Sequence, residues 1–182
     1  MSSGEEKSLP VSEETYGNIK ITAFDALKWV TSSYERTRWI NEDYPFFDVD
    51  TWKLWKLIYQ NEGVFYPGSL GRGEKTLFIE YPYYIAKDDG RFVGGMGLKG
   101  KKTIKVADGE ADLSSFYILV NPDDRRRGTG SALLRHMESD IKGDGFYTEW
   151  GPRKDLEFSE FMEKHGYSVV HEPLISRAIK MR

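Results

Sequence analysis

One segment near the middle of the chain constrains the fold more than any other. Residues 113–120 are a run of apolar and β-forming side chains, which predicts a buried strand. Residues 121–124 read Asn-Pro-Asp-Asp and predict a turn, because proline and Asx residues punctuate the chain. Three arginines follow, then Gly128 and Gly130, and apolar residues recur at helical spacing at Leu133, Leu134, Met137 and Ile141. The segment predicts a strand, a basic glycine-containing loop and a helix.

This arrangement favours the binding of an anion. The first backbone N–H groups of a helix have no partner inside the helix, and the helix dipole adds about half a positive charge there. Gly128 and Gly130 carry no side chain, so an anion can approach these groups closely. Arg125, Arg126 and Arg127 can add charge-assisted hydrogen bonds. The natural ligand is a phosphate or a pyrophosphate, and the alternative is a solvated basic turn before an ordinary helix.

The same residues carry a resemblance to a known family. Arg125-x-x-Gly128-x-Gly130 matches the Arg/Gln-x-x-Gly-x-Gly/Ala signature of the GNAT superfamily of acyl-CoA-dependent N-acyltransferases. Val120-Asn121-Pro122 resembles the Val-x-Pro that usually precedes that loop. Further on, residues 161–167 read Phe-Met-Glu-Lys-His-Gly-Tyr and are similar to the family's Phe-Tyr-Glu-Lys-Leu-Gly-Phe. The resemblance extends from about residue 83 to the C-terminus.

The expected architecture follows from the order of elements and from this resemblance. Strands that alternate with helices indicate an α/β domain, and 182 residues suit one domain with a proper core. The resemblance implies a single GNAT-like domain. Its mixed, mostly antiparallel central sheet has about seven strands, splays between the fourth and the fifth, and is flanked by about four helices. We expect residues 1–14 to be a flexible tail and 15–182 to form the domain, with 15–80 on the acceptor side and 81–182 as the acetyl-CoA-binding core.

The N-terminal half predicts a strand and two helices. Ile19 and Ile21 alternate with polar residues and predict a strand over 19–24. Asp25 is a candidate N-cap for a helix that carries Leu27, Val30 and Tyr34. A second helix is expected after Asp48 or Asp50, and it carries Trp52 and Trp55. Residues 63–76 are glycine-rich and form either a surface connection or a lid over a site.

The C-terminal half predicts the remaining elements. Strands over 83–87 and 91–98 are joined by a tight Asp89-Gly90 turn, and a polar excursion over 99–110 turns at Asp108-Gly109. Strands are also expected over 146–150, 167–170 and 175–181. A helix over 155–165 places Phe158, Phe161, Met162 and His165 on one side. Gly166 is its expected stop, and His165 is interpreted as a packing or capping residue.

The resemblance implies that acetyl-CoA is the co-substrate and indicates which residues hold it. Backbone groups of Ile118, Leu119 and Val120 would hold the pantetheine arm, and an N–H near Leu119 would polarise the thioester carbonyl. The loop from Arg125 to Ser131 would hold the pyrophosphate. The full expected set is Ile118, Leu119, Val120, Arg125, Arg126, Arg127, Gly128, Thr129, Gly130, Ser131, Asp155 and Met162.

The catalytic residues are less well defined by the resemblance. Family members often carry a tyrosine on the last helix as the acid for the leaving thiolate, but the matching position here is Met162. Some members place a glutamate base on the fourth strand, where this chain has Ser114. Asp112 lies two residues earlier and is therefore on the same strand face, although it also fits an exposed strand-edge carboxylate. Further candidates are Glu149 as a base and Tyr167, Tyr117 or Tyr147 as an acid.

These observations lead to an expected function with alternatives. We expect an N-acetyltransferase that moves an acetyl group from acetyl-CoA to an amine by direct attack in a ternary complex. The chain has no cysteine, so a thiol-linked enzyme intermediate is excluded. A small-molecule amine is the expected acceptor, and a protein N-terminus or lysine is the alternative. A CoA-binding regulatory module without turnover is the alternative outside enzymes.

Composition restricts the other partners. The net charge of −3 argues against nucleic acid as a ligand. Three scattered histidines and no cysteine predict no metal site. No apolar run approaches the ~20 residues that a membrane helix needs, and residues 1–14 have no apolar signal-peptide region, so we expect a cytoplasmic protein without a membrane partner. A homodimer is considered as well as a monomer.

Overall fold

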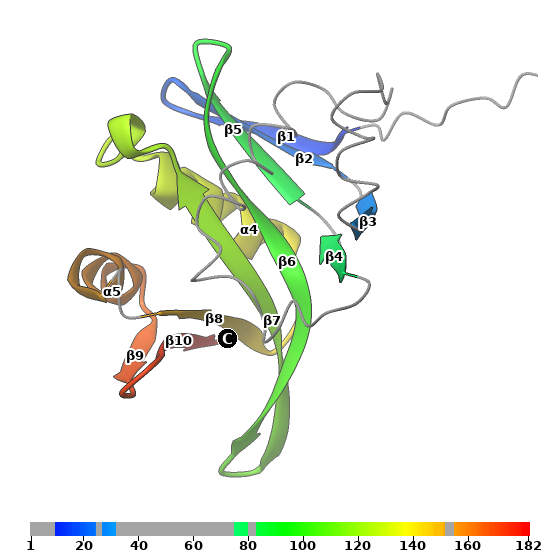
Figure 1. Cartoon of the computed structure of the whole chain (residues 1–182), viewed down its shortest axis with the longest axis vertical. Helices are drawn as coiled ribbons and strands as arrows, with labels where there is room; N and C mark the ends of the chain where they lie inside the picture. Colours follow the sequence, from blue (N-terminus) through cyan, green and yellow to red (C-terminus); the bar gives the residue numbers. More distant parts are fainter. Residues whose placement is uncertain (1–9, 25–26, 32–74, 80–82, 152–154) are drawn as a thin grey trace, which may run out of the picture.

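One large sheet organises the molecule (Figure 1). The computed structural model describes residues 10–24, 27–31, 75–79, 83–151 and 155–182. Eight strands form this sheet in the order β1-β2-β5-β6-β7-β8-β10-β9, and every neighbouring pair is antiparallel except β7 and β8. The strands are Pro10–Tyr16 (β1), Ile19–Phe24 (β2), Tyr83–Asp88 (β5), Arg91–Val106 (β6), Gly109–Val120 (β7), Gly145–Trp150 (β8), Ser168–His171 (β9) and Ser176–Met181 (β10). The predicted mixed, mostly antiparallel α/β sheet is confirmed.

The parallel pair in the middle of the sheet separates along its length. The helix α4, Thr129–Asp140, connects β7 to β8, as a parallel pair requires. The two strands pair only where residues 113–115 of β7 face residues 145–147 of β8. Beyond Ser115, β7 continues to Val120 with β6 as its partner, and β8 continues to Trp150 with β10 as its partner. The predicted splay of the sheet therefore begins after the pair Ser115 and Tyr147.

The main core lies between α4 and one face of the sheet. Leu133, Leu134 and Met137 of α4 are fully buried, as the helical spacing predicts. They belong to one cluster with Ile21 of β2 and Phe116 of β7. Burying a side chain of this size contributes roughly 1.5–3 kcal/mol, so this layer holds α4 against the sheet.

The hairpins of the central sheet match the sequence in part. Asp89 and Gly90 both have positive φ, at 48° and 77°, which is the requirement of the predicted two-residue turn. The polar excursion predicted over 99–110 is instead an extension of β6 and β7, and it turns at residues 107–108. This arm projects beyond the sheet in Figure 1. The alternation of apolar and polar residues along this arm is weak, because residues on both of its faces are exposed, so the sequence pattern did not predict these strands.

The N-terminal predictions need two corrections. The chain is already paired at Pro10, so a tail over 1–14 is too long, and residues 1–9 lie outside the description. β1 is an edge strand with exposed polar residues, which explains its tail-like composition. Leu27–Thr31 form β3, not the helix expected after Asp25, because they pair with Lys75–Ile79 (β4) in a second sheet. That partner is distant in the sequence, so local spacing could not reveal it.

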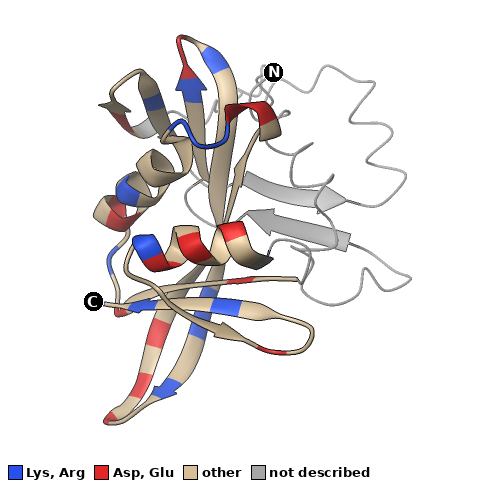
Figure 2. Ribbon diagram, turned by 90° about the vertical axis from the view of Figure 1, so that its left-hand side faces the viewer, with Lys and Arg blue, Asp and Glu red and all other residues tan. Residues whose placement is uncertain are grey.

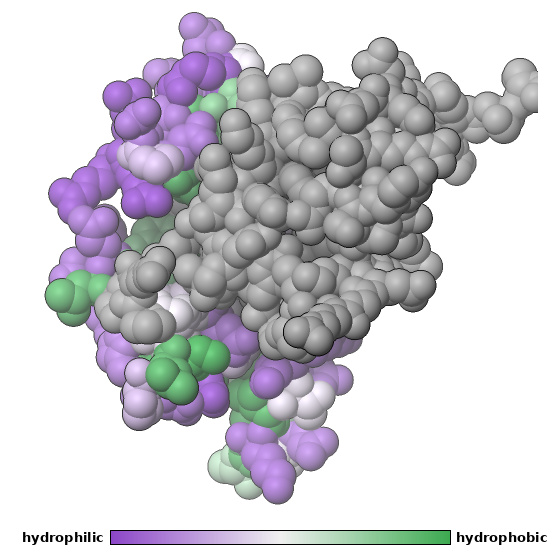
Figure 3. Space-filling view, viewed as in Figure 1, coloured by the Kyte–Doolittle hydropathy of each residue, from purple (hydrophilic) through white to green (hydrophobic). Residues whose placement is uncertain are grey.

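The remaining helix predictions fall on residues that the structure does not describe. These are the positions of Tyr34, Trp52 and Trp55, and most of the 63–76 loop. Within the described residues there are two α-helices, α4 and Asp155–Lys164 (α5), and one 3₁₀ turn, Pro122–Asp124. None of the described helices is long and apolar enough to cross a membrane. The described surface in Figure 3 is mostly hydrophilic, with isolated hydrophobic residues.

The strand β1 is tied to α4 through one buried histidine. His136 is 2 % exposed, and its Nε2 lies 2.9 Å from Ser12 Oγ. Its Nδ1 lies 3.2 Å from a carboxylate oxygen of Glu14, and its ring packs edge-on against Tyr84 at 5.6 Å. Hydrogen bonds from Tyr16 and His136 lower the pKa of Glu14. The N-terminal edge strand is therefore anchored on the helix that follows the arginine loop.

Candidate functional site

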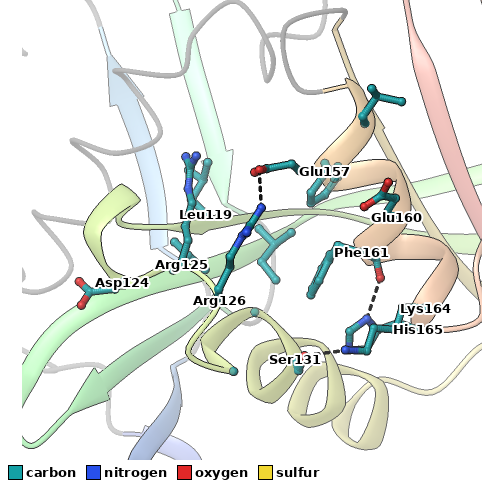
Figure 4. Close-up of a pocket in the computed structure, with 16 residues that line it drawn as sticks. Leu119, Asp124, Arg125, Arg126, Ser131, Glu157, Glu160, Phe161, Lys164 and His165 are labelled. Atoms are coloured by element: carbon teal, nitrogen blue, oxygen red, sulfur yellow. Dashed lines mark hydrogen bonds and ion pairs between the residues drawn. The ribbon is translucent and has the colours of Figure 1, made fainter.

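A pocket of about 950 Å³ lies where β7, the N-terminus of α4 and α5 meet (Figure 4). Ile118, Leu119 and Val120 line it from the part of β7 that has no β8 partner. The loop before α4 supplies basic and glycine residues, and α5 supplies both apolar and charged side chains. The pocket is thus bounded by backbone on two sides, at a strand edge and at a helix N-terminus.

The N-terminus of α4 opens into this pocket. Gly128 is its N-cap in a left-handed conformation, with φ of 88°, which is costly for other residues. No side chain caps the helix, and the first helical hydrogen bond runs from the Ala132 N–H to the Gly128 carbonyl at 2.9 Å. The N–H groups before Ala132 therefore precede the helical ladder. Space around Gly128 is open, since no atom lies within 4 Å of an added Cβ.

Gly130 has a packing role instead. A Cβ at this position would lie 3.0 Å from the ring of Phe161 on α5. Phe161 stacks with Phe158, and Phe158 packs edge-on against the buried Trp150 at 4.8 Å. The absence of a side chain at Gly130 therefore lets α5 approach the first turn of α4, which closes one wall of the pocket.

A buried carboxylate holds the turn in front of the loop. Asp124 is 3 % exposed, and it accepts hydrogen bonds from both terminal nitrogens of Arg91, at 2.9 and 2.6 Å. Asn121 Nδ2 donates to the same carboxylate at 3.3 Å, and Arg127 lies 3.9 Å away. The Arg91 hydrogen bond lowers the pKa of Asp124. Figure 2 shows the acidic turn directly before the basic loop.

The three arginines have different surroundings. Arg125 and Arg126 line the pocket, whereas Arg127 is directed toward Asp124. Arg126 has a positive φ of 62°, and its Nη2 donates to Glu157 of α5 at 2.7 Å. Both side chains of this pair are largely exposed, at 82 % and 73 %. The pair therefore crosses the pocket from the loop to α5, as Figure 4 shows.

A second link between the helices lies deeper. Ser131 is in the first turn of α4, and its Oγ lies 2.9 Å from Nε2 of His165. The other ring nitrogen of His165, Nδ1, lies 2.7 Å from the carbonyl oxygen of Phe161. Ser131 and His165 both line the pocket.

The end of α5 is Schellman-like, because Tyr167 N–H bonds to Met162 O and Gly166 has a φ of 83°, which confirms the predicted stop.

The structure brings together most of the expected cofactor-binding residues. Arg127, Thr129 and Met162 do not line the pocket, and Met162 is fully buried in the core. The side chain of Asp155 lies outside the description. The members of the expected set that do line the pocket are Ile118, Leu119, Val120, Arg125, Arg126, Gly128, Gly130 and Ser131.

The candidate catalytic residues are spread over the sheet. Asp112 is exposed on the β6–β7 arm and accepts a hydrogen bond from Thr103 at 2.6 Å. Ser114 is buried on β7, one residue before the last contact with β8. Tyr167 donates to Glu138 at 2.9 Å on the α4 side of the sheet, and burial raises the pKa of its phenol. None of these three lines the pocket.

Glu149 lies beside the point where the strands separate. Tyr147 belongs to the last β7–β8 pair, and it donates a hydrogen bond to Glu149 Oε2 at 2.6 Å. Phe146 and Trp150 belong to the core under α4, while Tyr147 packs with Leu113 in a separate cluster. The Tyr147–Glu149 pair therefore faces away from α4. Burial, and then the Glu149 carboxylate, raise the pKa of Tyr147.

The sequence placed this helix at the cofactor through Asp155 and Met162, but it missed the α5 residues that line the pocket. Glu157, Glu160, Lys164 and His165 all line it, together with Phe158 and Phe161. The helical spacing of Phe158, Phe161 and His165 was a usable signal, but it fits packing as well as binding. Within the described residues no group of three or more histidine, cysteine, aspartate or glutamate side chains could hold a metal ion.

Comparisons with known proteins complete the description. Residues 80–169 match a family model described as an acetyltransferase (GNAT) domain, while the comparison with curated proteins found no match. Similar structures include a GNAT-family acetyltransferase from Streptococcus agalactiae, with 15 % identity over 55 % of this chain and 65 % of that one, at a TM-score of 0.45. The chain thus spans about two thirds of the length of that protein.

Two further structures cover more of the chain. The Bacillus subtilis N-acetyltransferase YlbP in complex with coenzyme A has 13 % identity over 87 % of this chain and 96 % of that one, at a TM-score of 0.41. Arabidopsis thaliana Naa50 in complex with a bisubstrate analogue has 16 % identity over 89 % and 97 %, at 0.43. The family assignment rests on the match of residues 80–169, which places the chain among the GNAT acetyltransferases, a family of acyltransferase enzymes.

Proposed function

We propose that this protein transfers an acetyl group from acetyl-CoA to an amine by direct attack within a ternary complex. The observation that carries the proposal is the position of the pocket. It joins the open N-terminus of α4 to the part of β7 that has no β8 partner. One end of the pocket suits a pyrophosphate, and the other offers backbone groups at a strand edge.

The residues suit the parts of CoA in turn. The pyrophosphate would accept hydrogen bonds from the first N–H groups of α4, with Arg125 and Arg126 beside them. The amides of the pantetheine arm would pair with main-chain groups of residues 118–120, much as a neighbouring strand would. Asn121 N–H donates to Val93 O of β6, and by strand alternation the N–H of Leu119 also faces β6, at Gly95. The N–H groups on either side of it, of Ile118 and Val120, face the open edge and are our candidate donors to the thioester carbonyl.

The acceptor would approach from the opposite face of the sheet. There we assign Glu149 as the proton acceptor and Tyr147 as the proton donor. The amine nitrogen forms a bond to the acetyl carbon, the carbon–sulfur bond breaks, and the amine proton passes to Glu149 directly or through water. Tyr147 can supply the proton that the thiolate takes up, and it regains a proton from Glu149, to which its hydroxyl is hydrogen-bonded at 2.6 Å.

The acceptor is proposed to be a small-molecule amine, and a protein amine is the second candidate. The activity test therefore combines acetyl-CoA with small amines in one panel and with peptides that carry a free N-terminus or a lysine in another. Release of CoA thiol that depends on one class of amine identifies the acceptor. Binding of CoA without amine-dependent thiol release would instead favour a regulatory module without turnover.

The CoA pocket itself is tested by the substitution Gly128→Glu. This change places a carboxylate where the phosphates would lie and strains a backbone with φ of 88°. We expect micromolar binding of acetyl-CoA by the wild type and loss of binding by the variant, measured by isothermal titration. Gly90→Glu at the distant β5–β6 turn is the matched control, because it also replaces an exposed glycine with positive φ. Equal affinity in wild type and the Gly128 variant would overturn the assignment.

A further inference from the structure

The contact between Ser131 and His165 fixes the protonation of the histidine ring. A carbonyl oxygen can only accept a hydrogen bond, so the 2.7 Å contact with Phe161 O requires a proton on Nδ1. In the neutral ring, Nε2 is then without a proton and acts as an acceptor. The 2.9 Å contact with Ser131 must therefore be donated by the serine hydroxyl.

That arrangement is poorly suited to an anion. When His165 is neutral, the hydroxyl proton of Ser131 points at the ring, and only oxygen lone pairs remain for a ligand. When His165 is doubly protonated, Nε2 becomes the donor to Ser131 Oγ. The hydroxyl proton of Ser131 is then free to point into the pocket, which both residues line (Figure 4). The charged ring also adds a positive charge beside the N-terminus of α4.

We propose that His165 is a positioning residue that couples the binding of CoA phosphate groups to the uptake of one proton. The inference rests on the proposed function, because it needs the phosphates in this pocket. The pattern that residues 161–167 resemble has leucine at the position of His165, so this coupling is not implied by the resemblance. Ser131 is the group that contacts the ligand, and His165 acts through it.

The charged groups around His165 fit such a coupling. On α5, Lys164 and Glu160 line the same pocket, so they place opposite charges near the ring. From β10, Lys180 donates to the main-chain oxygen of His165 at 2.9 Å, and it is paired with Glu138 of α4 at 2.8 Å. Across the pocket, Arg126 is paired with Glu157. Lys180 and Arg126 are thus each balanced by a carboxylate, and a bound phosphate adds the negative charge that favours a protonated ring.

The probe for the test is 3′-dephospho-CoA. It retains the pyrophosphate but lacks the monoester phosphate, whose own proton is lost near pH 6 and would hide the effect. Its affinity is measured by isothermal titration from pH 5.5 to 8.5, and at pH 7 in two buffers that differ in ionisation enthalpy. For the wild type, we expect the affinity for the probe to fall by up to about tenfold per pH unit as the pH rises above about 6.5, where an ordinary histidine loses its proton. Binding should also be accompanied by a net uptake of protons.

Two variants separate this role from simple packing. In His165→Gln the side chain cannot gain a proton, so affinity should become independent of pH and proton uptake should disappear. His171→Gln is the matched control, because His171 lies on β9, contacts Ser176 at 2.8 Å and does not line the pocket. This control should keep the wild-type pH slope. If His165 only packed against or capped α5, the substitution His165→Gln would change thermal stability but leave the slope of log Kd against pH unchanged.

The outcomes distinguish the inference from the proposed function. Binding of the probe with the same pH slope in wild type and His165→Gln would overturn the inference alone. Absence of binding by wild type at every pH would overturn both. If the variant does not fold, nitrogen-detected NMR of the wild-type histidines decides. We expect the Nδ1–H form in the free protein and both nitrogens protonated in the complex, and an Nε2–H form in the complex would contradict the proposal.

Discussion

At the scale of single residues, the site depends on where a few charges are held. Asp124 is buried and accepts two hydrogen bonds from Arg91. Arg126 and Glu157 form an exposed ion pair across the pocket. The Asp124–Arg91 contact holds the start of the basic loop. The Arg126–Glu157 pair engages an arginine that could otherwise bind a phosphate. Glu149 is separate from both, on the other face of β8 and bonded by Tyr147.

Removing the carboxylate of Glu157 should strengthen CoA binding. An exposed ion pair is worth less than about 1 kcal/mol, so Glu157→Gln should lower the Kd for CoA by roughly two- to fivefold at low salt. The gain should shrink as salt screens the charges. Glu163→Gln, also on α5 but outside the pocket, is the control. Weaker binding by the Glu157 variant would mean that this carboxylate itself contacts the ligand.

Removing the carboxylate of Glu149 should separate binding from turnover. With no proton acceptor beside the thioester, Glu149→Gln should reduce kcat by about 10²-fold or more, while the Kd for CoA stays near the wild-type value. A thiol-release assay measures kcat, and isothermal titration measures the Kd for CoA. Glu172→Gln, which changes a nearby carboxylate paired with Arg177, should retain most activity. Near-normal kcat in the Glu149 variant would remove this residue from the mechanism.

At the scale of elements, the basic loop works only if its two ends are fixed. Its start is held by the 3₁₀ turn through Asp124, and its end by α4 packed into the core. The sequence was sufficient to predict the strand, turn, loop and helix around this site, because each is encoded by neighbouring residues. The sequence also predicted α5 as a helix, but not which of its residues line the pocket, since Phe161 and His165 reach the pocket through contact with Gly130 and Ser131.

The substitution Asp124→Asn tests the anchor of the turn. It removes the negative charge and one of the two acceptors of Arg91, and it places an NH₂ donor against the guanidinium, so we expect Tm to fall by about 4 °C or more at pH 7. Because the native pKa of Asp124 lies below its ordinary value of 3.8, this stabilisation is present above that pH and is lost as the pH falls through the native pKa. The Tm difference from wild type should therefore shrink in acid. Asp123→Asn, at the exposed neighbouring position, should show neither effect.

At the scale of the whole molecule, distant pairing decides what the sequence could not. β3 needs β4, which lies more than 40 residues further along the chain, so the helical spacing of Leu27 and Val30 was misleading. β1 resembles a tail in composition because it is an edge strand, and its place is set by contacts of Ser12 and Glu14 with His136. Local signals predicted the central strands well, because β5, β6 and β7 follow one another along the chain and pair across short turns. The C-terminal strands were also predicted from local signals.

The gap between β7 and β8 has a consequence for the protein as a folding unit. Past Ser115, the side of β7 that would face β8 has no strand partner among the described residues, so the sheet contains an edge in its interior. Such an edge leaves amide groups to exchange their hydrogens with solvent until something pairs with them. A ligand whose own amides lie along this edge would act as a short extra strand and complete the sheet. The two halves of the molecule would then be joined by the substrate as well as by the chain.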